Sequence, residues 1–390
     1  MLAGALLSCL LAAPGAGLDL ELRTEGRQRT VAPVGADPQR AWELEVAPLG
    51  RLRLTGRELD LTASYAPRFT LSERPGERTS LLHRAALLGG WRPSPPSRLT
   101  LGLEGAEGTV SLLQLLAAAP RPGQPPAPAE PVPTISAIRY RSGTATLGLS
   151  SSASARLRLR GSVAGFVEGG ATLEARRSLP QQRGGRVEAG LEWDATRRDV
   201  LATALTATLS DLRPGSTARY GVLAESWRHA LTAHTRAWVT AGASLASQEA
   251  ASAAARTPWR LRPAGELGVA HELTREPERL RATAAIAQTP VLDRSTGVVV
   301  DRTTASATLS AVMARDWLLD ATGSGGVVVG GPEARDSIWV GELRGGRRLG
   351  DPFELSLGVR GLSQRQPRLD ARAYEWAVFA AVLVRHRERP

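Results

Sequence analysis

Residues 231–245 alternate between apolar and polar side chains for longer than a strand of a soluble protein normally runs. One set includes Ala237 and Val239, whereas the other includes His234 and Arg236. Successive side chains of a strand point to opposite faces, so the stretch predicts a ribbon with one apolar and one polar face. Ordinary strands have about 5–6 residues, but a tilted strand needs about 9–11 to cross a bilayer. The pattern suits a wall between lipid and water, and a strand of a large soluble sandwich is the alternative.

Similar alternating stretches, one of them over residues 153–178, recur along most of the chain from residue 134 onward, separated by short segments that carry Pro, Gly or Asp. With the earlier stretches they predict 16 to 18 strands in an antiparallel series, and no helix-length pattern interrupts them. A single sheet of this width closes on itself or leaves its edges exposed. We therefore predict an all-β fold, a closed antiparallel transmembrane β-barrel of about 18 strands. Sixteen strands are the next choice, because single-chain barrels favour even numbers.

The composition agrees with a barrel between lipid and water. Aromatic residues make up 4% and hydrophobic residues 42% of the 390 residues, which is thin for a soluble core of this size. A membrane barrel needs no thick core of side chains. The net charge is +11, and every cation is an arginine. The arginines are spread along the chain instead of being clustered with aromatics, which argues against binding of nucleic acid.

Four segments define the expected organisation. Residues 1–17 form an apolar run that ends in small residues, and they predict a signal peptide. Residues 18–390 are expected to form the barrel, and no run of about 18 apolar residues predicts a transmembrane helix. Residues 108–119 have helical spacing and predict a short amphipathic helix at the interface or inside the barrel, with an ordinary packed turn as the alternative. Residues 120–133 are rich in proline and predict an exposed extended loop.

Tryptophans occur where predicted strands meet turns, as is typical of the two aromatic girdles of a membrane barrel. Trp238 is an exception, because it lies in the middle of its strand. The candidate girdle residues are Trp42, Trp91, Trp193, Trp227, Trp259 and Trp376.

Arginine alternates with leucine at two places, residues 51–53 and 156–160. If Leu157 and Leu159 face lipid, their arginine neighbours face the lumen, because Arg at the bilayer midplane costs about 2–4 kcal/mol. Such a lumen would favour anionic solutes or polymers. Alternatively, the arginines pair with lumen acids and have no net effect; Glu43, Glu45, Glu188 and Glu192 have the strand spacing for this. The candidate lumen-lining residues are Arg51, Arg53, Arg156, Arg158, Arg160, His234 and Arg236.

No pattern for catalysis or cofactor binding is found. The five histidines do not share the spacing of metal ligands, no HExxH or GxSxG motif occurs, and Cys9 is the single cysteine. The chain contains no Asn, which excludes the Ser-His-Asn arrangement of barrel phospholipases. We therefore expect no catalytic, cofactor-binding or metal site, and no enzyme.

The whole pattern resembles outer-membrane β-barrel proteins of myxobacterial type. The likeness rests on the meander, on Ser-Tyr-Ala-Pro-Arg-Phe-Thr-Leu at 64–71 and on Leu-Glu-Gly-Ala-Glu-Gly at 103–108. Within that group the chain resembles the barrel components of composite polysaccharide-export translocons. The resemblance implies a barrel of about 18 strands in the outer membrane, above a periplasmic polysaccharide-export protein. The resemblance implies no catalytic residues. Residues 374–384 resemble the C-terminal assembly signal of outer-membrane proteins.

The leading hypothesis is therefore an outer-membrane conduit for polysaccharide export. Its expected partners are outer-membrane lipid, a periplasmic export protein and an anionic polysaccharide, with no cofactor. One alternative is a general porin or solute channel. Another is a structural or adhesive barrel without an open pore.

Overall fold

The computed structural model describes residues 15–32, 39–73, 79–111, 137–212, 215–249, 256–275, 278–293, 298–313, 316–329, 336–350, 353–366 and 371–387. Nearly all of these residues lie in strands, and a six-residue helix, α3 (Leu173–Ser178), follows the eighth strand. The strands are β1 (Ala16–Ala32), β2 (Gln39–Thr55), β3 (Leu59–Tyr65), β4 (Arg68–Ser72), β5 (Thr79–Ser94), β6 (Ser97–Ser111), β7 (Ala137–Ser152), β8 (Leu157–Gly170), β9 (Gln182–Asp194), β10 (Asp199–Leu212), β11 (Ser216–Ala230), β12 (Thr235–Glu249), β13 (Arg256–Arg275), β14 (Glu278–Asp293), β15 (Val298–Met313), β16 (Trp317–Val329), β17 (Ser337–Arg348), β18 (Phe353–Gln366) and β19 (Ala371–Arg387).

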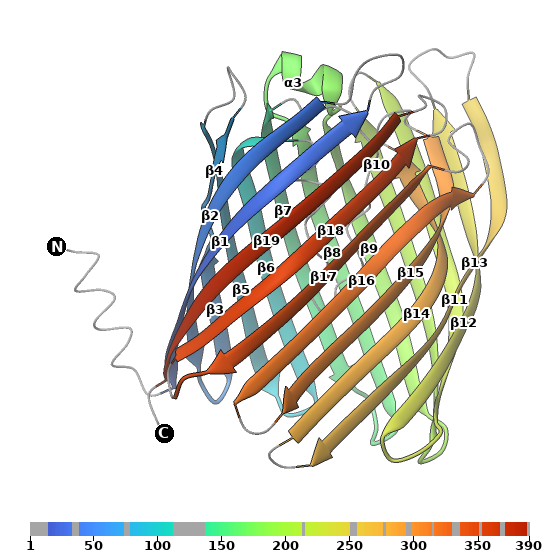
Figure 1. Ribbon diagram of the computed structural model, residues 1–390. Helices are drawn as coiled ribbons and strands as arrows, with labels where there is room; N and C mark the ends of the chain where they lie inside the picture. Colours follow the sequence, from blue (N-terminus) through green and yellow to red (C-terminus); the bar gives the residue numbers. More distant parts are fainter. Residues whose placement is uncertain are drawn as a thin grey trace.

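The strands form one closed antiparallel barrel (Figure 1). β1 pairs with β2 on one side and with β19 on the other, and the pairing with β19 extends from Gly17↔Arg387 to Ala32↔Arg372. β3 and β4 both pair with β2 and β5 in one continuous register, so they form one barrel strand that is interrupted before Arg68. Pro67 lies at this interruption and has no backbone N–H to donate. The barrel therefore has 18 strands, which confirms the fold predicted from the sequence.

The two ends of the barrel differ. The end at which β1 begins and β19 finishes, here called the termini end, has short turns such as residues 153–156 and 195–198. The opposite end, here called the α3 end, carries the longer connection of residues 171–181 with α3 (Figure 1). Short turns at one end and longer loops at the other are typical of outer-membrane barrels.

The barrel wall is apolar outside and polar inside. On β2, Trp42 and Leu44 are exposed, whereas Glu43 and Glu45, which alternate with them, are buried. Exposed leucines and valines continue around the wall, as at Leu147 and its neighbours. Contiguous apolar surface of this extent does not occur on a soluble monomer, so the outer face is one that meets lipid.

Some charged residues lie on the outer face, and the carboxylate of Glu225 is one of them. Glu225 lies between Leu223 and Trp227 on the same face of β11 and is exposed. It accepts a hydrogen bond from the Thr203 hydroxyl on β10, at 2.8 Å between the two oxygens. The bond supplies a partner for a charge that would otherwise be costly near lipid.

Eight tryptophans are exposed on the outer face, at two levels of the barrel. Trp339 pairs with Gly325, which lies eight residues from Trp317 along β16. Eight residues span about 26 Å along a strand, or about 20 Å along the axis when strands are tilted by about 40°. This separation is close to the height of the apolar band of a membrane barrel. The level near the termini end holds Trp91, Trp193, Trp227 and Trp317, and the level near the α3 end holds Trp42, Trp259, Trp339 and Trp376.

Several boundaries differ from the sequence predictions. The expected strand over 231–245 begins only at Thr235, because residues 231–234 form a turn in which the Thr232 hydroxyl accepts the Thr235 N–H. The expected strand over 153–178 ends at Gly170 and is followed by α3. There Thr172 caps the helix by accepting the Ala175 N–H, and Glu174 favours the first turn.

Other predictions fall at the limits of the description. Residues 108–111 belong to β6 and are not helical, and residues 112–133 lie outside the described residues. The predicted signal peptide also lies almost entirely outside them, although β1 already begins at Ala16. In the part of the chain that the structure describes, no helix is long and apolar enough to cross a membrane.

Candidate functional site: the inner wall of the barrel

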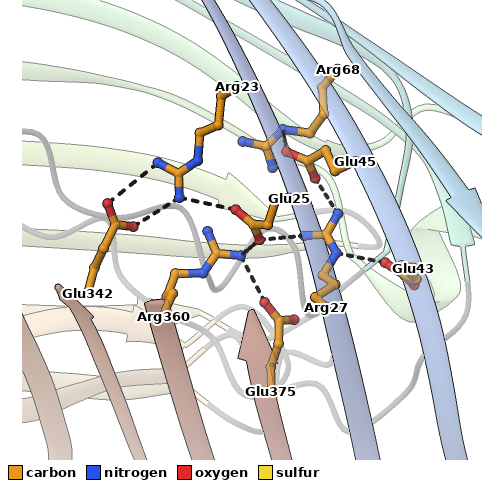
Figure 2. A network of polar contacts seen from close by, with 9 residues as sticks. All are labelled: Arg23, Glu25, Arg27, Glu43, Glu45, Arg68, Glu342, Arg360 and Glu375. Carbon is orange, nitrogen blue, oxygen red and sulfur yellow. Dashed lines mark hydrogen bonds and ion pairs between the residues drawn. The ribbon is translucent and has the colours of Figure 1, made fainter. Parts of the chain in front are cut away.

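Ion pairs that cross non-adjacent strands identify the inner face. Arg23 on β1 contacts Glu342 on β17 at 3.2 Å, although β19 and β18 lie between these strands. Neighbouring strands are about 4.8 Å apart, so side chains can bridge three such steps only where they converge on the concave side of the wall. Glu25 and Arg27 have the same parity on β1 and point to the same side (Figure 2).

A network of nine charged residues covers this face toward the α3 end (Figure 2). Arg27 contacts Glu43 at 3.0 Å, Glu25 at 3.6 Å and also Glu45. Arg68 on β4 contacts Glu45 at 2.9 Å, so one carboxylate binds two guanidinium groups. The network, here called the buried network, consists of Arg23, Glu25, Arg27, Glu43, Glu45, Arg68, Glu342, Arg360 and Glu375.

Arg360 links the last strands of the barrel to the first. It contacts Glu375 on β19 at 2.9 Å and also Glu25 on β1. The network thereby ties β1, β2 and β4 to β17, β18 and β19 across the junction between the two ends of the chain. Four arginines and five glutamates make it nearly balanced in charge.

The centre of the buried network is withdrawn from water. The side chains of Arg27 and Glu25 are 1% and 2% exposed, and that of Glu375 is 1% exposed. Burial of a charge is tolerated when it is paired, and each of these buried charges contacts at least one opposite charge. Removing one member would leave its partners buried without compensation, so the network fixes the arrangement of these strands.

An aromatic ring packs against the network from β19. The guanidinium carbon of Arg23 lies 3.6 Å from the centre of the Phe379 ring, which is a cation–π contact. The ring lies over Gly358 on the neighbouring strand, where an added Cβ would approach its Cζ to 2.3 Å. A glycine is therefore required at position 358 for this packing.

Two elements pack inside the barrel at the α3 end. The first is α3 with its flanking residues, of which Ala175 and Leu179 are buried against Leu82, Val110 and Ile138. These three residues come from β5, β6 and β7. The α3 segment therefore covers part of the wall from the inside.

The second element is the end of the β14–β15 hairpin, here called the infolded hairpin, with described residues 289–293 and 298–302. β14 pairs with β13 only as far as Gly265↔Gln288, whereas its pairing with β15 continues to Asp293↔Val298. The hairpin end thus leaves the wall. Leu292 and Val299 pack in a cluster with residues of β10, β11 and β12, which are Leu212, Ala218 and Ala246.

Polar contacts fasten the infolded hairpin to the wall. Arg262 on β13 donates a hydrogen bond to the Val299 carbonyl at 3.1 Å and contacts Asp301 at 3.3 Å. The Val299 N–H donates to the Gln248 side chain at 2.9 Å. The lumen is therefore narrowed at the α3 end from two sides.

The inner wall at the termini end has a different character, because its arginines are half exposed. Asp19 contacts Arg53 at 2.8 Å and Arg51 at 3.9 Å. Asp60 contacts two further arginines, Arg92 at 3.1 Å and Arg98 at 3.3 Å.

A third group lies further around the wall on β8, β9 and β11. Arg158 contacts Glu192 at 2.9 Å and Asp194 at 2.5 Å, and Arg228 also contacts Glu192. We call the three groups, Asp19 with Arg51 and Arg53, Asp60 with Arg92 and Arg98, and Arg158 and Arg228 with Glu192 and Asp194, the arginine clusters.

The structure places five of the seven candidate lumen residues on strands with inward parity. Arg51, Arg53 and Arg158 belong to the arginine clusters. Arg160 lies beside Gly190, with no ion pair to any residue that the structure describes. Arg236 likewise has no such ion pair, and it shares the face of Trp238, whose indole N–H donates to Glu266 at 2.6 Å. The inward direction of Trp238 accounts for its position in mid-strand.

The other two candidates lie in turns and not in strands of the wall. Arg156 belongs to the turn of residues 153–156, and its carbonyl accepts the Asp194 N–H. His234 belongs to the turn of residues 231–234, where its ring is 3.1 Å from the Glu272 carbonyl. The alternation used for their assignment continues through both turns, which is why the sequence did not separate them from the strands.

Most of the buried network was not identified as a site from the sequence. Glu43 and Glu45 were noted for their strand spacing, and their partner Arg27 alternates with Glu25 in the same way. That period-two pattern of charges was the available signal. The partner Glu342 could not be found, because its contact with Arg23 depends on how the barrel closes.

Solved structures resemble the chain at low sequence identity. The outer membrane protein OpdK from Pseudomonas aeruginosa is 12% identical, with a TM-score of 0.46 over 95% of this chain and 99% of that chain. OccAB3 from Acinetobacter baumannii is 10% identical, with a TM-score of 0.47 over 96% of this chain and 100% of that chain. A BenF-like porin from Pseudomonas fluorescens Pf-5 is 10% identical, with a TM-score of 0.47 over 96% and 99%.

The sequence comparisons give a family assignment. No curated protein matches the chain. Residues 14–388 match the family described as the EpsX exopolysaccharide export family, which places the barrel in the outer membrane and in exopolysaccharide export or channel function. Because the match extends over nearly the whole chain, the protein belongs to the EpsX exopolysaccharide export family.

Proposed function

We propose that this barrel is the conduit through which an exopolysaccharide crosses the outer membrane. The observation that carries the proposal is the polar, arginine-bearing inner wall inside a closed barrel with an apolar outer face. A hydrated polymer can pass only where water can, and in a bilayer that requires a wall that satisfies its backbone internally.

In this proposal the asymmetry of the two ends sets the orientation of the barrel in the membrane. Short turns of outer-membrane barrels face the periplasm, so the termini end is the periplasmic entrance in this proposal. The half-exposed arginine clusters then meet the polymer first, and the infolded hairpin and α3 lie at the exit. A periplasmic polysaccharide-export protein, as the sequence resemblance implies, would deliver the polymer to the termini end.

A strain that lacks the gene, compared with the same strain complemented with the wild-type chain, tests this proposal. We expect loss of cell-surface exopolysaccharide on deletion, with the polymer retained inside the cell, and recovery with the wild-type chain. Normal secretion by the deletion strain would contradict the proposal.

The second candidate is a general solute channel, because the same polar lumen would pass small solutes. Conductance of the purified barrel in planar bilayers separates the two functions. The channel alternative predicts a large, permanently open conductance and normal polysaccharide secretion in the deletion strain. The conduit predicts a small conductance, because the infolded hairpin and α3 narrow the α3 end.

A further inference from the structure

We propose that the arginine clusters at the termini end form a binding site for the carboxylate groups of an acidic polysaccharide. The inference rests on the proposed conduit function and names the chemical class of its substrate. The buried network does not qualify as such a site, because its central arginines, Arg27 and Arg360, are only 1% and 8% exposed and already contact glutamates.

The arginine clusters have guanidinium N–H groups beyond those that their ion pairs use. Each guanidinium has five N–H groups, and Arg92 and Arg98 each use only Nη2 in their contact with Asp60. The side chains of Arg53, Arg98 and Arg158 are 44%, 44% and 49% exposed. The remaining N–H groups therefore face water in the lumen, where a carboxylate could accept them in the bidentate geometry that arginine favours.

In two of the three clusters the charge is not balanced by the acids beside the arginines. Asp19 and Asp60 each share one negative charge between two arginines. Arg160 and Arg236 lie on the same inner face and have no ion pair with a described residue. Together these two clusters, Arg160 and Arg236 carry a surplus of positive charge, and low-dielectric walls concentrate its field within the lumen.

The placement of the clusters fits a polymer better than a small anion. They occupy separate parts of the wall, on β1–β2, on β3, β5 and β6, and on β8, β9 and β11. Exposed ion pairs are individually weak, so one carboxylate is held loosely at any cluster. A chain with repeated carboxylates gains affinity from several weak contacts together, and weak contacts also let it move onward.

Binding of polygalacturonate to the purified barrel in non-ionic detergent tests the inference directly, because this readout does not depend on an open pore. Dextran serves as the uncharged probe. The inner variant R53Q/R98Q/R160Q removes three exposed arginines of the termini end. The matched outer variant R141Q/R219Q/R347Q removes the same charge from the outer face, where Arg347 stacks on Trp317. Heat-modifiable migration on gels shows whether each variant is folded.

The expected result is binding of polygalacturonate, but not dextran, to the wild type. We expect the affinity for polygalacturonate to be about tenfold lower in the inner variant and unchanged in the outer one. Added salt should weaken the binding of polygalacturonate to the wild type strongly. Equal losses in both variants, equal binding of dextran, or no binding of polygalacturonate would overturn the inference. Those results would not contradict the proposed conduit function, because secretion by the deletion strain tests that function separately.

Discussion

The two halves of the lumen use the same residue type in opposite ways. Toward the α3 end, Arg27 is buried and contacts three glutamates. At the termini end, Arg53 is half exposed and shares one aspartate with Arg51. In both regions these contacts join residues of β1 to residues of β2. Asp19 and Arg27 lie only eight positions apart on β1. Arginine thus holds strands together where water is absent, and it stays available to an anion where water is present.

The largest effect is expected from removing a buried arginine. Arg27→Met leaves Glu43 and Glu45 without this partner, and breaking a buried ion pair costs about 3–5 kcal/mol. The free energy of unfolding, measured by urea titration in liposomes, should fall by this amount.

Arg53→Gln is the matched control for that substitution. Its side chain is exposed, and exposed ion pairs contribute about 0–1 kcal/mol. If both substitutions destabilise the barrel equally, the contrast between the two halves of the lumen is wrong.

The infolded hairpin gives the next effect. Leu292 is buried among Leu212, Ala218 and Val299, and Leu→Ala at such a site costs about 2–5 kcal/mol. We expect Leu292→Ala to loosen the hairpin and to raise the single-channel conductance in planar bilayers. Leu267→Ala removes the same atoms from the exposed outer face of β13 and should leave the conductance unchanged. Equal conductance of the two variants would show that the hairpin does not narrow the lumen.

A smaller loss of stability is expected from a charge placed on the outer face of the barrel, which meets lipid. Leu205 lies on the exposed side of β10, four residues from Leu201, which pairs with Trp193 and Trp227. Leu205→Arg should destabilise the barrel by about 2–4 kcal/mol in liposomes. Thr206→Arg, one residue further on the inner face, should cost less than Leu205→Arg. The reverse order would invert the assignment of the two faces.

The sequence predicted the wall well but not what packs inside it. Alternation alone placed Trp42 and Leu44 on one face and Glu43 and Glu45 on the other, because a strand has a fixed period of two. The inward contacts depend on closure instead. Arg23 meets Glu342 only because β1 and β19 pair, and no local pattern specifies that pairing.

Local departures from the two-residue period of the strands were also not predicted from the sequence. The turn of residues 231–234 continues the alternation of β12, so the strand was predicted four residues too long. The segment around α3 was predicted as strand, although Thr172 and Glu174 form a recognisable helix start. The infolding of the β14–β15 hairpin is a tertiary effect, produced by Leu292 and Val299 finding partners on β10 to β12.

A cysteine scan along β10 tests the central claim, a closed cylinder with lipid outside and water inside, most directly. Single cysteines at Ala204, Leu205, Thr206 and Ala207 would be introduced with Cys9 replaced by serine, and the variants reconstituted in liposomes. Leu205→Cys and Ala207→Cys should carry a fluorophore that lipid-bound quenchers reach. Ala204→Cys and Thr206→Cys should instead react with a water-soluble thiol reagent. Labelling without this period of two, or with its phase reversed, would contradict the account.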